Sequence, residues 1–183
     1  MSFFLEERMK ISFLRITANY EAIAGILSKL PGKILVLATP TIEAISLCQE
    51  IISNSPAVEI LATKELRISQ ESSKLPPRKP NNGWILPEHT DEAAIWDEIV
   101  TIRRYILQKA RTHGEDTIVI LPECIIDLVS ASLRNNVQNL QMLLLVPQLH
   151  LDRIGVVLTV EGHQVAVEEV RVERWPGEHN PCM

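Results

Sequence analysis

The sequence is poor in glycine and aromatic residues, and it lacks the glycine-rich motifs that bind nucleotides. It has seven glycines in 183 residues, and the aromatic share is 4%. No dinucleotide-binding turn, phosphate-binding loop, nucleophile elbow or H-E-x-x-H pair is present. Because a backbone cradle for a pyrophosphate depends on glycine, we expect neither a Rossmann-type dehydrogenase nor an NTPase.

Cysteine and aspartate are also too sparse to build familiar sites. Cys48, Cys124 and Cys182 are widely spaced and form no C-x-x-C pair, so neither a disulfide framework nor a zinc knuckle is indicated. No aspartate ends the first or second predicted strand, which argues against metal-dependent phosphoryl chemistry with paired carboxylates. We therefore predict a cytoplasmic protein without a metal or cofactor.

Long apolar runs are absent, and the net charge is negative. The N-terminal MSFFLEERMK has three consecutive apolar residues before two glutamates, which predicts neither a signal peptide nor a membrane anchor. Either Met1 or Met9 remains open as the natural start. A formal net charge of -5 argues against general DNA binding. With 46% hydrophobic and 22% charged residues, residues 1–183 are expected to form a single packed α/β domain.

Short apolar runs predict the strands, and the runs at residues 117–121 and 140–146 lack polar alternation, as expected for strands that are covered on both faces. The predicted strands lie at residues 10–16, 33–38, 57–62, 117–121 and 140–146. Helical repeats follow several of them, and strand–helix–strand units give parallel sheets. The prediction is a three-layer Rossmann-like sandwich with a mostly parallel sheet of about five strands.

Three further segments complete the predicted architecture. Residues 64–83 carry five basic residues and several prolines with few periodic apolar positions, which predicts a mobile basic loop. Residues 154–174 predict a C-terminal antiparallel hairpin, with a β-bulge at Glu168 and Glu169 where the valine alternation changes phase. Residues 176–183 are expected to form a frayed tail.

Capping residues indicate where two of the helices begin. Thr39 followed by Pro40 is typical of a helix start, and Thr90 precedes a second helix. The first of these helices is predicted to present one apolar stripe to the core, made of Ile42, Ile45, Cys48, Ile51 and Ile52.

A functional site is expected beyond the carboxyl ends of the parallel strands, where ligands bind in open sheets of this kind. The predicted ligand-binding residues each follow a strand there: Thr17, Thr39, Thr41, Lys64, Glu123 and Gln148. Threonine hydroxyls and helix amides suit an anion, and the basic loop could clamp phosphates from above. Ordinary helix capping and a solvated charged loop explain the same residues without a ligand.

Cys124 and His150 form the one predicted catalytic pair. Cys124, in the segment LPEC, falls where a buried strand meets a helix N-terminus, a position that lowers a thiol pKa. His150 follows the next predicted strand and could act as its base. Against this, Glu123 would raise the thiol pKa, and a free cysteine is often a small buried apolar residue.

The general plan resembles Rossmann-like sensor domains, including the nucleotide-sensing domains associated with CRISPR systems. The resemblance lies in strand order and in the position of LATPT, residues 37–41, after a strand. The leading hypothesis is a non-catalytic domain that binds a small anionic or nucleotide-like ligand. One alternative is a structural or assembly protein that self-associates, as a homodimer or larger homo-oligomer, through the C-terminal hairpin. The other is a cysteine-nucleophile hydrolase.

Overall fold

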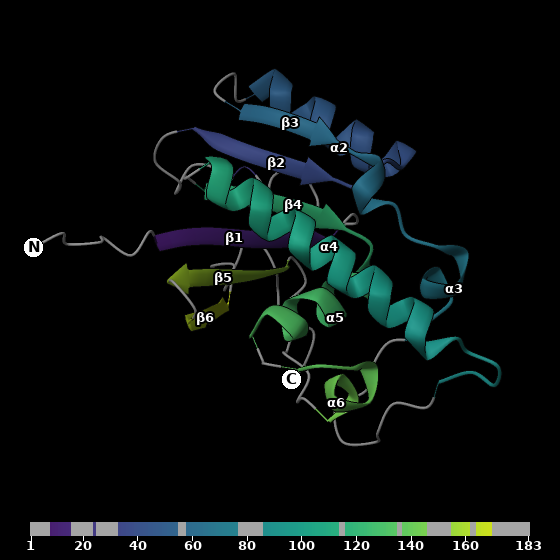
Figure 1. Ribbon diagram of the computed structural model, residues 1–183. Helices are drawn as coiled ribbons and strands as arrows, with labels where there is room; N and C mark the ends of the chain where they lie inside the picture. Colours follow the sequence, from purple (N-terminus) through teal and green to yellow (C-terminus); the bar gives the residue numbers. More distant parts are fainter. Residues whose placement is uncertain are drawn as a thin grey trace, which may run out of the picture.

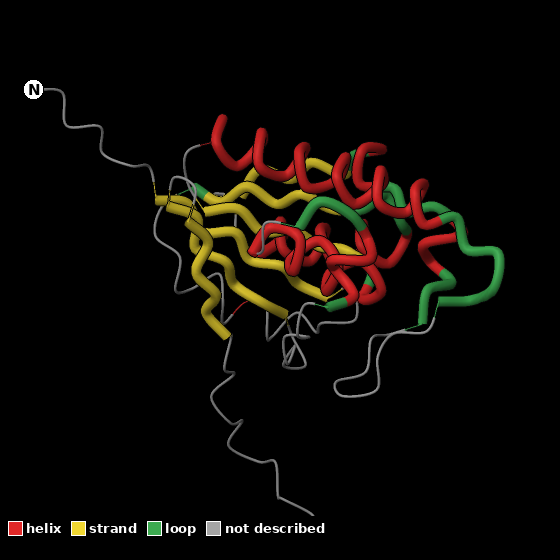
Figure 2. Tube along the Cα trace, turned by 60° about the horizontal axis from the view of Figure 1, so that its bottom comes forward, coloured by secondary structure: helices red, strands yellow, loops and turns green. Residues whose placement is uncertain are grey.

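Six strands form one sheet, in the order β3-β2-β4-β1-β5-β6 (Figures 1 and 2). The computed structural model describes residues 8–15, 24, 33–54, 58–76, 86–113, 116–134, 137–145, 155–161 and 164–169. The strands are β1 (Arg8–Arg15), β2 (Ile34–Ala38), β3 (Val58–Ala62), β4 (Asp116–Leu121), β5 (Gly155–Glu161) and β6 (Gln164–Glu169).

Four of these strands are parallel, and the two C-terminal strands are not. β3, β2, β4 and β1 run in one direction, whereas β5 is antiparallel to β1 and β6 is antiparallel to β5. The pairing of β5 with β6 falls within residues 154–174. Its register runs unbroken from Gln164 to Glu169, so the predicted β-bulge at Glu168 and Glu169 is wrong. The change in valine phase occurs at the end of the described strand.

The fifth parallel strand, predicted at residues 140–146, is also wrong. Leu140–Leu144 form the short helix α6, and the Asn139 side chain caps it by accepting a hydrogen bond of 2.8 Å from the Met142 amide. Leu140 and Leu143 are buried while Met142 is exposed, which is helical periodicity. A short apolar run does not by itself separate a strand from a helix, and here the cap decides for the helix.

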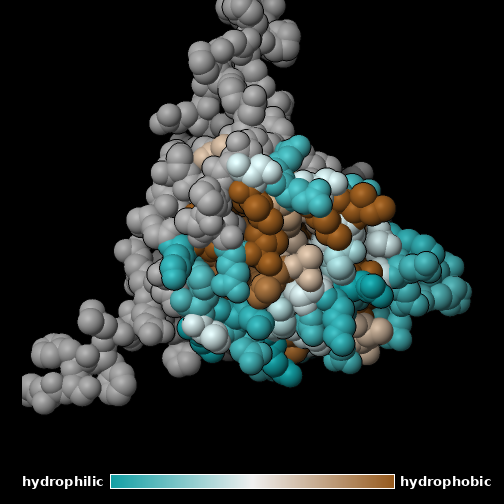
Figure 3. Space-filling model, turned by 90° about the horizontal axis from the view of Figure 1, so that it is seen from above, coloured by the Kyte–Doolittle hydropathy of each residue, from teal (hydrophilic) through white to brown (hydrophobic). Residues whose placement is uncertain are grey.

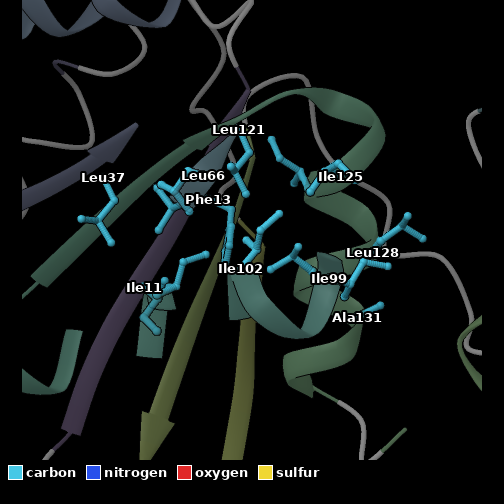
Figure 4. Close-up of a cluster of buried hydrophobic side chains, with 14 of the residues drawn as sticks. Ile11, Phe13, Leu37, Leu66, Ile99, Ile102, Leu121, Ile125, Leu128 and Ala131 are labelled. Carbon is cyan, nitrogen blue, oxygen red and sulfur yellow. The ribbon is translucent and has the colours of Figure 1, made fainter. Parts of the chain in front are cut away.

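Helices cover both faces of the sheet and make two separate cores. The helices are α2 (Ile42–Asn54), α4 (Glu92–His113) and α5 (Glu123–Arg134). Alternate residues of β2 point to opposite faces: Leu35 and Leu37 join the core under α4 and α5, whereas Val36 packs with α2. Figure 4 shows side chains from β1, η1, α4 and α5 converging in the first core. In the described part of the chain, no helix is long and apolar enough to cross a membrane.

Residues 64–76, part of the predicted mobile loop, are folded against α4. They contain the 3-10 helix η1 (Lys64–Leu66) and the short helix α3 (Gln70–Ser73), and they bury Leu66 and Leu75 in the core. The apolar residues are too few for a periodic signal. Leu66 and Leu75 nevertheless occupy core positions, so the absence of helices predicted for this segment is wrong, and its mobility stays a prediction.

The buried stripe of α2 differs from the predicted one. Cys48 and Ile51 are buried as expected, but Ile42, Ile45 and Ile52 are exposed. Ala44 and Leu47 complete the buried face instead. Seven apolar residues surround much of this helix, so the sequence pattern alone did not identify which of them meet the sheet.

The hydroxyl of Thr117 in β4 is buried without a hydrogen-bond partner among the described residues. A buried hydroxyl that makes no hydrogen bond loses its hydration without compensation. We expect Thr117→Val, which keeps the shape of the side chain, to raise the free energy of unfolding by about 1–2 kcal/mol in urea titrations. Thr117→Ser keeps the hydroxyl and should not stabilise; a Val variant no more stable than wild type would contradict the prediction.

Candidate functional site

The carboxyl ends of the parallel strands bring three described segments together. Ala38 lies opposite Ala62 on one side and Ile120 on the other, so β2, β3 and β4 end at the same level. Backbone hydrogen bonds between neighbouring strands continue past these ends. The Thr39 amide donates to the Ile120 carbonyl at 3.1 Å, and the Thr63 amide donates to the Ala38 carbonyl at 3.2 Å. Thr39 and Thr63 therefore extend the sheet edge, because each directly follows a parallel strand.

Thr41, rather than Thr39, caps α2. The Thr41 hydroxyl accepts from the Ala44 amide at 3.3 Å, and its carbonyl accepts from the Ile45 amide at 2.9 Å. Thr39 is instead buried beneath the turn, and its carbonyl accepts from the Thr41 amide at 2.9 Å. The first-turn amides of a helix have no acceptor within it, and the positive end of the helix dipole lies here. The α2 N-terminus thus presents donors at the sheet edge.

The segment after β3 supplies both positive and negative charge. Thr63 caps η1 by accepting from the Glu65 amide at 3.3 Å, and its hydroxyl also donates to the Glu65 carboxylate. That hydrogen bond, followed by one from a backbone amide, holds the pKa of Glu65 below its ordinary value. Lys64 and Arg67 are exposed beside it. Two cations and one persistently ionised carboxylate therefore share this part of the edge.

The segment after β4 places Glu123 and Cys124 in the first turn of α5. Cys124 is partly buried and packs against the core under α4 and α5. The amides of Ile125 and Ile126 both donate to the Pro122 carbonyl at 3.1 Å. An oxyanion hole needs amide donors aimed at the reacting atom, and these two are already bonded within the turn.

Thr17, Gln148 and His150 lie outside the described residues. Gln148 and His150 were expected at this edge because a fifth parallel strand would lead to them, and α6 replaces the first part of that strand. The pairing of Cys124 with His150 has lost its topological argument and stays a prediction. Sequence reasoning did not select Arg15, which ends β1 opposite Leu121 and so reaches the same edge. The feature of the sequence that could have identified it is a basic residue at the end of a buried apolar run.

Metal ligands are not gathered in the described part of the chain. No group of three or more histidine, cysteine, aspartate or glutamate side chains is placed there to hold a metal ion. The side-chain and backbone groups described at the edge are hydroxyls, helix amides, the cations of Lys64 and Arg67, and the Glu65 carboxylate. Such a set is suited to hydrogen bonding and charge pairing with a polar ligand.

Comparison with known proteins gives a likeness of fold. No family model matches the sequence. No curated protein matches it either. Among solved structures, phosphoglycerate mutase from Plasmodium falciparum has a TM-score of 0.54 and 11% sequence identity, over 94% of this chain and 97% of that one. At this identity the likeness concerns the fold alone. The chain has an α/β fold similar to that of phosphoglycerate mutase.

Proposed function

We propose that the protein is a non-catalytic α/β domain that binds a small anionic or nucleotide-like ligand at the carboxyl end of its parallel strands. The observation that carries this proposal is the meeting of the α2 N-terminus with Thr39, Thr41 and Thr63 at one level of the sheet. Amides at a helix N-terminus and the hydroxyl of Thr41 are good donors to phosphate or carboxylate oxygens. Lys64 and Arg67 add positive charge beside them.

The structural neighbour supports the ligand class but not the chemistry. Its name denotes an enzyme acting on phosphoglycerate, an anion of the proposed kind. In this chain, the described residues that directly follow parallel strands include no histidine. In the first turn of α5, which contains Cys124, two amides are bonded to the Pro122 carbonyl. These observations favour binding over a reaction with Cys124 as nucleophile.

Ligand binding is tested by thermal shift with inorganic phosphate, pyrophosphate, AMP and 3-phosphoglycerate at millimolar concentration. A ligand at ten times its dissociation constant adds about 1.4 kcal/mol to stability, which is a rise of roughly 3–5 °C for a chain of this size. We expect Thr41→Ser to retain the rise and Thr41→Val to lose most of it. Lys64→Ala should reduce the rise in melting temperature relative to wild type, and the reduction should be larger for the more highly charged probes.

The comparison uses the change in melting temperature on adding the ligand, because Thr41→Val also removes a helix cap and lowers stability by itself. Thr112→Val is the matched control. Its exposed hydroxyl donates to the Gln108 carbonyl at 2.8 Å in the last turn of α4, at the opposite end of the sheet. Equal shifts in wild type, Thr41→Val and Lys64→Ala would contradict a site at this edge, and so would the absence of any shift with all four probes.

A further inference from the structure

Helix α2 has a second apolar face that no described residue covers. Its core face packs Ala44, Leu47, Cys48 and Ile51 against the sheet. Ile42, Ile45 and Ile52 are nevertheless 81%, 41% and 51% exposed, and they make up three of the five large apolar residues found exposed in the described chain. Ile45 and Ile52 are seven residues apart, which is two helical turns, so they lie in line on one flank of α2.

This flank adjoins the free edge of the sheet. β3 is the first strand in the sheet order and pairs only with β2 among the described strands. Figure 3 looks down on the end of the molecule that carries α2 and β3 and shows apolar surface bordered by hydrophilic residues. A strand edge with unpaired backbone groups invites pairing with another strand, and an exposed apolar patch marks an interaction surface. Both features occur here together.

We infer that this surface, made of β3 with Ile42, Ile45 and Ile52, binds a second copy of the chain in an antiparallel, two-fold symmetric dimer. A two-fold axis at Ile60 sets β3 antiparallel to its copy, with Glu59 opposite Leu61 of the partner subunit. In the proposed dimer the same axis passes beside the middle of α2, where Ile45 and Ile52 lie three and four residues on either side of the central residue Cys48. Each Ile45 then meets the partner's Ile52, which is the self-complementarity that a two-fold interface requires.

The charges of α2 favour this occupant. Glu43 and Glu50 are about 200° around the helix from Ile45 and Ile52, so an α2–α2 contact through the isoleucines brings no glutamates of these positions face to face. β3 has only five residues, and pairing of so short a strand is weak without side-chain burial. The isoleucines supply that burial. In the dimer the β3 edge of each subunit pairs with that of the other, so no β3 edge remains free. A closed dimer is therefore expected rather than a growing chain of strands.

Sedimentation velocity of the full chain from about 1 to 200 µM tests the inference. We expect a concentration-dependent monomer–dimer equilibrium in wild type. The double variant Ile45→Lys, Ile52→Lys should raise the dissociation constant on the order of 100-fold, because each lysine enters the interface twice. Leu145→Lys is the matched control: Leu145 is 85% exposed on the α6 side, and its replacement should leave the dissociation constant unchanged.

Cross-linking provides a second readout that does not depend on affinity. Gln49 is exposed on α2 between Ile45 and Ile52, so in the proposed dimer Gln49→Cys lies close to the axis and should form a disulfide-linked dimer on mild oxidation. Glu43→Cys, on the opposite flank of the same helix, should not exceed the background of wild type, whose own cysteines are also present. A chain that is monomeric at 200 µM overturns the inference. So does a dimer that survives both lysine substitutions, since it must then form through another surface such as the C-terminal hairpin.

Discussion

Replacing Glu98 by alanine is expected to lower the free energy of unfolding by about 3 kcal/mol, or the melting temperature by roughly 6–12 °C. Glu98 of α4 accepts three hydrogen bonds from the segment after β3. The Ser69 amide and hydroxyl donate at 2.7 Å each, and the Ser72 hydroxyl donates at 2.6 Å. Ser72 is fully buried. The alanine variant therefore leaves a buried hydroxyl without its acceptor as well as removing three charge-assisted bonds.

Two variants separate this effect from a general weakening of α4. Alanine is a better helix former than glutamate, so helix propensity opposes the expected loss. Glu92→Ala removes one exposed hydrogen bond, from the Gln141 side chain at 2.6 Å, on the same helix. We expect it to cost less than about 1 kcal/mol.

Hydrogen exchange should locate the effect of Glu98→Ala. Faster exchange is expected for the amides of residues 66–75, because Glu98 holds α3 and its cap against α4. Exchange that rises equally throughout the chain, or a stability loss no greater than that of Glu92→Ala, would contradict a specific role for the Ser69–Ser72–Glu98 cluster.

This cluster illustrates which parts of the fold were accessible from sequence. The bonds from Ser69 and Ser72 to Glu98 span 29 and 26 residues, and no local pattern announces them. The sequence therefore predicts a loop at residues 64–76. By contrast, β2 and β4 were predicted within a residue of their observed bounds, because residues 34–38 and 117–121 are all buried and only Thr117 among them is polar.

The site was predictable to the extent that topology alone fixes it. A residue that follows a parallel strand must lie at the carboxyl edge, which is why Thr39 and Thr63 are found there. The sequence TPT did not reveal which threonine caps α2, since both are competent and Pro40 fits either arrangement. The error at residues 140–146 had a larger effect, because the expected positions of Gln148 and His150 depended on a strand there.

The thiol of Cys48 should make the folded protein less stable as the pH rises from 9 to 11. Cys48 is buried on the core face of α2 with Leu47 and Ile51. Burial raises its pKa from the ordinary value of 9.0 to about 11, because a thiolate there would lose its hydration. In the unfolded chain the thiol ionises near pH 9, while in the folded protein it stays neutral until about pH 11. Rising pH consequently stabilises the unfolded state selectively across this interval.

The expected size is about 2 kcal/mol between pH 9 and pH 11, because each tenfold difference in proton affinity contributes about 1.4 kcal/mol and the thiol is only half ionised in the unfolded chain at pH 9 and in the folded protein at pH 11. Urea titrations at pH 8, 9, 10 and 11 give the difference in free energy of unfolding between wild type and Cys48→Ala. The change in this difference with pH measures the effect. The alanine variant starts less stable because of the lost sulfur, and the gap should narrow or reverse as the pH rises. Tyrosines and lysines titrate in both proteins, so their effects cancel. Parallel profiles for wild type and Cys48→Ala would show that Cys48 ionises as readily in the folded protein as in the unfolded chain, which would contradict its burial between α2 and the sheet.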